Sequence, residues 1–200
     1  MNIAVLASHH GTNLQAIIDA CEQHTLHARV CMVMSNNSAS GAAERARRHD
    51  IPFYHLSGVT HPNPDELDAA MRDRLEAEKA DLVFLAGYMK QMGPKTLERF
   101  QGSILNTHPA LLPKFGGKGM YGLHVHRAVI EAGETESGVS IHIVEAEYDT
   151  GPVVAQCKID VASQDTPATL AERVMIRERQ FVVETLQKIA EGSLLLPGWR

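Results

Sequence analysis

Two polar residues, Asn106 and His108, follow an apolar run and precede a loop rich in proline and glycine. An asparagine amide can donate to a developing oxyanion, and a histidine can move protons or bind that oxyanion when charged. Such a histidine usually has a carboxylate beside it, and Asp149 in the segment YDTG is the candidate. Without a GxSxG motif, this trio would handle protons but supply no nucleophile. The simpler alternative is that Asn106 caps a turn and His108 packs against it.

A second candidate site is the turn SHHGTNLQ, which joins an apolar run to a segment with helical spacing. The first turn of a helix has free N–H groups and a positive dipole end, which suit phosphate. Gly11 would let a ligand approach the backbone, Thr12 adds a hydroxyl, and Asn13 can cap the helix or bind the ligand. With one glycine and no GK[ST], this is neither a dinucleotide fingerprint nor a Walker A loop. A plain turn capped by Thr12 or Asn13 is the alternative.

His124 and His126 in the segment HVH are the candidates for a metal site. Two residues at this spacing share a face on a strand but not on a helix. The flanking residues resemble the start of a helix, and no HExxH or ExxH pattern supports zinc. We therefore expect no metal.

The elements that must position these residues alternate along the first half of the chain. Apolar runs predict strands, and segments with apolar residues at helical spacing predict helices, so we expect a mainly parallel sheet with helices on its faces. The second half predicts a mixed or antiparallel extension and one long last helix. The expected strands are 3–7, 29–34, 53–56, 81–86, 103–106, 138–144 and 152–160. The first expected helix begins after residues 12–13, and the others span 41–49, 64–79, 94–100, 123–132 and 167–192.

Composition narrows the class of protein. The chain has 200 residues, 44% of them apolar, which fits one domain over 1–200. The net charge of −5 carries no basic excess for nucleic acid, and no apolar run approaches the ~20 residues that cross a membrane. Three widely spaced cysteines and an N-terminus without a basic leader predict a cytoplasmic protein.

Five segments carry a resemblance to a known family: SHHGTNLQAIIDA, SNNSASGAAERA, LAGYMKQM, ILNTHPALLPKF and GVSIHIVEAEYDTGPVVAQ. In this order they resemble the formyltransferases that use 10-formyltetrahydrofolate, and among them the glycinamide ribonucleotide members of purine synthesis. The resemblance extends from about Met1 to Gly192. It implies a Rossmann-like formyltransferase fold. It also implies formyl transfer from 10-formyltetrahydrofolate, as co-substrate, to the amine of 5′-phosphoribosylglycinamide, by a monomer or homodimer without a metal.

The resemblance also assigns roles to residues. Asn106 and a charged His108 would stabilise the oxyanion, and Asp149 would keep His108 charged. The ribonucleotide would be bound by Gly11, Thr12, Asn13 and Glu178. The folate would be bound by Leu85, Met89, Lys90, Gln91, Met92, Asn106, Glu145, Ala146, Glu147 and Tyr148.

The chain departs from the family pattern at three places. His9 stands where a glycine is common, which requires a negative φ at that residue. Pro64 stands where many members have an arginine that meets folate, so we expect no such contact. The loop after Phe115 is lengthened, and Lys118 or Tyr121 could contact substrate or another subunit.

Two other functions fit part of these observations. A sugar-nucleotide formyltransferase would share the trio but act on a different amine. A non-catalytic nucleotide-binding module would use the Gly11 turn alone and would not need His108. A deformylase or a methionyl-tRNA formyltransferase would need an additional domain, which we do not expect here.

Overall fold

The computed structural model describes residues 1–197 and contains a seven-stranded sheet in the order β3-β2-β1-β4-β5-β6-β7. The strands β1 to β5 run parallel, whereas β6 is antiparallel to both β5 and β7. The predicted change from parallel to antiparallel pairing is therefore confirmed. The strands are β1 Asn2–Leu6, β2 Arg29–Ser35, β3 Phe53–His55, β4 Leu82–Leu85, β5 Ile104–His108, β6 Glu136–Ile143 and β7 Val153–Asp160.

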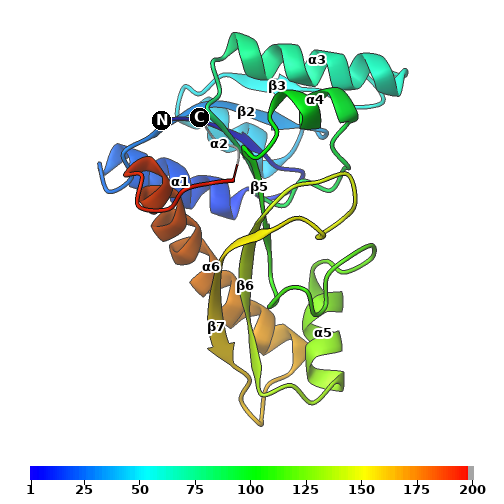
Figure 1. Ribbon diagram of the computed structural model, residues 1–200, viewed down its shortest axis with the longest axis vertical. Coiled ribbons are helices and arrows are strands. Elements are labelled where there is room, and N and C mark those ends of the chain that lie inside the picture. Colours follow the sequence, from blue (N-terminus) through cyan, green and yellow to red (C-terminus); the bar gives the residue numbers. More distant parts are fainter. Residues whose placement is uncertain (198–200) are drawn as a thin grey trace.

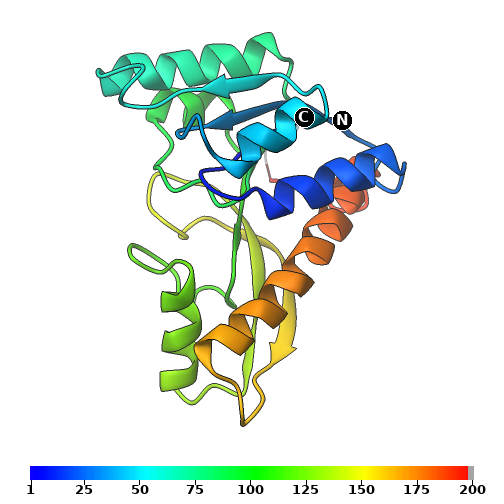
Figure 2. The same ribbon diagram turned by 180° about the vertical axis from the view of Figure 1, so that it is seen from behind.

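Helices cover both faces of the sheet. One face is covered by α1 and the long α6, which lie together in Figure 2, and the other by α3 and α4, at the top of Figure 1. None of the helices within residues 1–197 combines the length and apolar character needed to cross a bilayer. The helices are α1 Thr12–Glu22, α2 Gly41–Arg48, α3 Pro64–Ala77, α4 Pro94–Arg99, α5 Leu123–Glu131 and α6 Pro167–Ala190.

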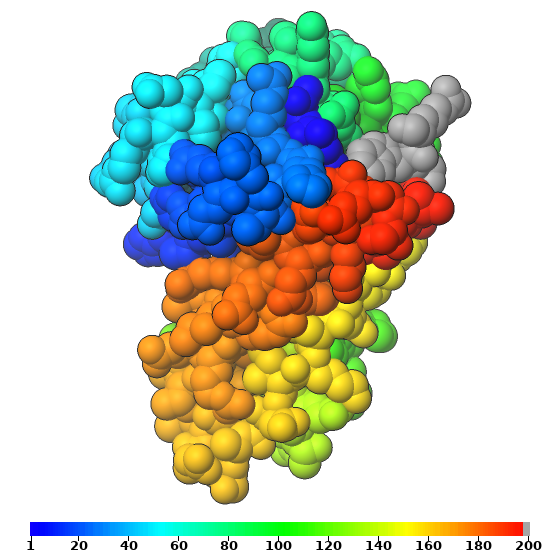
Figure 3. All heavy atoms as spheres, turned by 90° about the vertical axis from the view of Figure 1, so that its left-hand side faces the viewer, coloured from blue at the N-terminus to red at the C-terminus, as the bar shows by residue number. Residues whose placement is uncertain are grey.

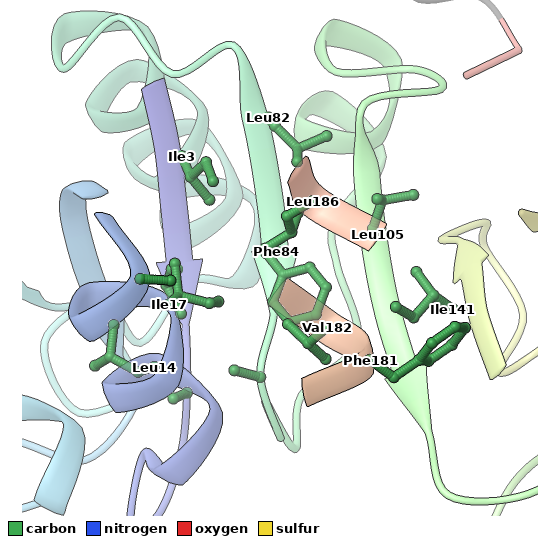
Figure 4. Packing of buried hydrophobic residues seen from close by; sticks show 14 of the residues in the cluster. Ile3, Leu14, Ile17, Leu82, Phe84, Leu105, Ile141, Phe181, Val182 and Leu186 are labelled. Atoms are coloured by element: carbon green, nitrogen blue, oxygen red, sulfur yellow. The ribbon is translucent and has the colours of Figure 1, made fainter. Parts of the chain in front are cut away.

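The larger core cluster lies between the sheet and the α1/α6 layer. Figure 4 shows Phe84 of β4 between apolar side chains of α1, such as Ile17, and of α6, such as Val182. Helical spacing in the sequence predicts that five apolar residues of α6 face inward, and all five are buried: Leu170, Val174, Phe181, Val182 and Leu186. In Figure 3, α6 (orange) crosses the surface directly below the N-terminal segments (blue). This packing brings Glu178 of α6 towards the turn at Gly11.

Alternation along β5 divides its side chains between the two faces. Ile104 belongs to the cluster under α3 and α4, whereas Leu105 belongs to the cluster under α1 and α6. The next residues continue this alternation, so Asn106 and His108 share a face and Thr107 points to the opposite one. The strand extends two residues beyond the predicted end at Asn106 because β6 continues to pair with it, up to the pair His108–Ser140.

Candidate active site

The end of β5 brings Asn106 and His108 against two neighbouring strands. Asn106 lies opposite Leu85 of the parallel β4 and opposite His142 of the antiparallel β6. His108 is paired only on the β6 side, past the end of β4. Both polar residues therefore lie within a strand, and not in the turn that the simpler alternative had Asn106 cap.

Asp149 reaches this strand from the segment between β6 and β7, drawn in yellow beside β5 in Figure 1. Its Oδ2 lies 3.5 Å from Nδ1 of His108, and its Oδ1 lies 3.3 Å from Nε2 of His142. The side chains of His108 and Asp149 are only 4% and 10% exposed. The structure thus brings the predicted trio together in a place with little water, where charge interactions are strong.

His142 is a further member of the cluster, and the sequence interpretation did not include it among the site residues. Its Nδ1 donates to the carbonyl of Ile143 over 2.8 Å, so in the neutral ring Nε2 is free to accept. The side-chain amide of Asn106 lies 3.1 Å from that Nε2. One amide N–H is thereby oriented, and the other remains for an oxyanion. A histidine inside the apolar run GVSIHIV was the signal that could have identified it.

The lengthened loop supplies backbone groups to the site. Nε2 of His108 lies 2.7 Å from the carbonyl of Phe115 and must carry a proton to donate to it. The N–H of Gly117 donates to Oδ2 of Asp149 over 2.9 Å. These two contacts leave Nδ1 as the nitrogen of a neutral His108 that can accept a proton, and it faces Asp149.

Burial and charge oppose each other at these groups. Burial lowers the pKa of His108, and so does the charge of His142. The charge of Asp149 and the hydrogen bond to the Phe115 carbonyl raise it but do not compensate. Burial raises the pKa of Asp149, but hydrogen bonds from the charged form of His142 and from the Gly117 N–H, together with the histidine charges, outweigh it, so the pKa falls. These shifts favour a charged Asp149 and a neutral His108, whereas the resemblance implied a charged His108.

A small hollow adjoins the trio on the face that carries Asn106. Its volume is about 50 Å³, and its wall includes Asn106, His142 and Asp149. All the residues that the resemblance assigned to folate line it except Met89, whose backbone N–H donates instead to Ser8. The lining folate candidates are Leu85, Lys90, Gln91, Met92, Asn106, Glu145, Ala146, Glu147 and Tyr148.

A larger cleft of about 560 Å³ continues from this hollow between α3 and α4. Gln91, Met92 and Ala146 line both spaces, and the side chain of Gln91 donates to the Ala146 carbonyl at their junction. Pro64 lies in the wall of the cleft, but the sequence interpretation missed the α3 and α4 residues beside it, among them Leu67 and Leu97. Helical spacing identified those positions only as core.

The turn at Gly11 lies on the other side of β5, under α6. Gly11 is the N-cap of α1 with φ 69°, and no side chain caps the helix, so capping by Thr12 or Asn13 is wrong. A Cβ at Gly11 would lie 3.0 Å from Cα of Ala42, so glycine is required both by φ and by space. Asn13 is buried and its Oδ1 has no partner within the described chain, which leaves an acceptor available. His9 has no positive φ, so its side chain is tolerated.

Comparison with known proteins decides the family. The model of the family described as "Formyl transferase" matches residues 1–186. The chain belongs to the formyl transferase family. It is 40% identical to "Phosphoribosylglycinamide formyltransferase, chloroplastic" of Arabidopsis thaliana over 99% of this chain and 67% of that protein. It is 39% identical to "Phosphoribosylglycinamide formyltransferase" of Haemophilus influenzae over 97% of this chain and 89% of that protein.

A solved structure confirms the formyl transferase fold. Glycinamide ribonucleotide transformylase 1 from Symbiobacterium toebii superposes with a TM-score of 0.90 and 38% identity, over 100% of this chain and 92% of that one. The Rossmann-like formyltransferase fold that the resemblance implied is therefore confirmed.

In this formyl transferase the two histidines of HVH lie in different surroundings. Both lie on α5, where His124 is exposed beside the ring of Tyr121 and His126 is buried. Burial and the nearby charge of His108 lower the pKa of His126. Within residues 1–197 no three histidine, cysteine or acidic side chains are grouped as metal ligands.

The segment that carries Asp149 depends on its glycine. Asp149 has φ 58°, a conformation that aspartate and asparagine tolerate better than other side chains. A Cβ at Gly151 would lie 2.0 Å from the carbonyl oxygen of Ile143, so the backbone would have to move.

We expect Gly151→Ala to displace Asp149, with a loss of about 1–3 kcal/mol in the free energy of unfolding. We expect kcat to fall roughly tenfold, because misplacement of a catalytic group is costly. Urea denaturation and steady-state kinetics measure both. Gly58→Ala is the matched control, since nothing lies within 4 Å of its added Cβ. Unchanged kcat in Gly151→Ala would mean that this segment does not set the catalytic geometry.

Proposed function

We propose that this protein transfers the formyl group of 10-formyltetrahydrofolate to the amine of 5′-phosphoribosylglycinamide, a step of purine synthesis. The observation that carries the proposal is the convergence of Asn106, His108 and Asp149 beside a hollow lined by the predicted folate residues. The Gly11 turn, on the opposite face of β5, supplies a separate place for a phosphate-bearing acceptor.

The chemistry follows from the state of each group. The amine nitrogen bonds to the formyl carbon, and one N–H of Asn106 donates to the oxygen that becomes negative. The amine proton passes to Nδ1 of neutral His108, and Asp149 stabilises the imidazolium that results. When the bond from the formyl carbon to N10 of the folate breaks, this proton goes to N10 directly or through a water. His108 then returns to its neutral form.

The donor would bind with its formyl end in the small hollow and its remainder in the larger cleft. A volume of about 50 Å³ holds only the reactive end of such a molecule, whereas the adjoining 560 Å³ can take a bulkier part. Besides Asp149, the charged residues that line the hollow are Lys90, Glu145 and Glu147. Met89 is 38% exposed, and we propose that it covers the folate from outside the hollow.

The acceptor would bind with its phosphate at the first turn of α1 and its glycinamide end near His108. Gly11, Thr12 and Asn13 would hold the phosphate through backbone N–H groups and short polar side chains. Glu178 would bind the ribonucleotide from α6. Burial raises the pKa of Glu178, while the side chains of Thr107 and Asn13 partly offset this.

An absorbance assay of folate product formation tests the function directly. We expect product only when the ribonucleotide is present, with ribose 5-phosphate, which has no amine, as the negative control. Product without the ribonucleotide would indicate a hydrolase. Formylation of a sugar-nucleotide amine instead would support the sugar-nucleotide enzyme, and binding without any turnover would support the nucleotide-binding module.

We propose that residues 1–200 form one formyltransferase domain that acts in the cytoplasm as a monomer or homodimer and binds no nucleic acid. The continuous sheet and the net charge of −5 support this. Residues 198–200 lie outside the described part. Light scattering across a range of protein concentrations measures the oligomeric state.

A further inference from the structure

Thr107 stands between the two catalytic candidates of β5 but points to the opposite face of the sheet. It is 8% exposed, and its hydroxyl donates to Oε1 of Glu178 on α6 over 2.9 Å. The bond joins the strand that carries Asn106 and His108 to the helix that faces the Gly11 turn.

This bond and a second one from the Asn13 side chain hold the Glu178 carboxylate. A carboxylate has about four acceptor sites on its two oxygens, so sites remain for a ligand after these two bonds. The carboxylate is partly buried, where an unpartnered acceptor is costly and a hydrogen bond to a charged group contributes more than usual. Asn13, with an acceptor also unpartnered, lies beside it. The hydroxyl therefore selects one orientation of Glu178 before any ligand binds.

We propose that Thr107 is a positioning residue for the acceptor, because its hydroxyl holds Glu178 in the orientation that binds the ribonucleotide. The same hydrogen bond connects this binding site to the strand that carries Asn106 and His108. The inference rests on the proposed function, because it takes the ribonucleotide as the ligand of Glu178. Since Thr107 faces away from the hollow that would take the folate, its effect is confined to the acceptor.

The test compares Thr107→Val, which keeps the shape and removes the hydroxyl, with Thr107→Ser, which keeps the hydroxyl. We expect Thr107→Val to raise KM for the ribonucleotide about tenfold, because the variant loses one hydrogen bond to a charged group. We expect kcat and KM for the folate to stay within about twofold, since neither depends on this bond. Thr107→Ser should restore the ribonucleotide KM.

Thr185→Val is the matched control, because Thr185 is a buried threonine on α6 that lies seven residues beyond Glu178. The proposal is overturned if Thr107→Val has the wild-type ribonucleotide KM. It is also overturned if the variant changes kcat and both KM values alike, or if Thr185→Val has the same effect. If valine prevents folding, Thr107→Ala provides the same comparison. Failure of the proposed function is distinguishable, since the wild-type protein would then form no product that depends on the ribonucleotide.

Discussion

Replacement of His108 by alanine is expected to lower kcat by roughly 10²–10⁴-fold, the contribution of a general acid–base group. The imidazole is the group that takes the amine proton and returns it to the folate nitrogen in the proposed reaction. Asp149 cannot replace it, because its pKa is lowered and it would hold a proton poorly.

The same variant should keep its affinity for the ribonucleotide, because the Gly11 turn lies on the other face of β5. Steady-state kinetics with both substrates separate kcat from KM. His124→Ala is the control, since this exposed histidine is on α5 and contacts Tyr121. Near-full turnover in His108→Ala would refute the catalytic assignment and favour a nucleotide-binding module.

Asp149→Asn is expected to lower kcat by roughly 10²–10³-fold, because the developing imidazolium loses the carboxylate 3.5 Å away. Asparagine preserves the side-chain shape and tolerates the positive φ of 58° at this position, so the loop should stay in place. The loss would then come from charge and not from displacement. Asp73→Asn, which removes an exposed carboxylate paired with Arg72 on α3, is the control.

The pH dependence of Asp149→Asn has a definite sign. Proton acceptance needs neutral His108, so kcat/KM should fall as pH decreases through the pKa of His108, which burial places below its ordinary value of 6.5. The charge of Asp149 raises that pKa, so its removal should shift the acid limb of the profile to lower pH. A shift to higher pH, or none together with full turnover, would contradict the proposed role of Asp149.

Much of the fold and of the trio could be predicted from the sequence, because both depend on local patterns. The apolar runs and helical spacings predicted the parallel half and the long α6. The segments NTH and DTG identified residues that the structure places within 3.5 Å of each other. Polar residues that can act in catalysis, placed at the ends of parallel strands, indicate where such a site lies.

The remainder depends on contacts that sequence spacing does not contain. His142 joins the site only through its antiparallel register with Asn106, and Phe115 and Gly117 contribute backbone atoms, which no residue type reveals. The cleft between α3 and α4 is lined by residues whose spacing also fits ordinary packing. Burial, which lowers the pKa of His108, is a property of the assembled fold.

The long final helix packs against α1, and the loop that bears Asp149 lies across the opposite layer. In a chain built in this way, changes in the α1/α6 layer alone can replace one acceptor by another. Substitutions under α6 would change which amine is recognised, while the residues that line the folate site would stay the same. Strand β5 thus separates the α6 layer from the face that carries Asn106 and His108, and new acceptors can arise without rebuilding the reaction centre.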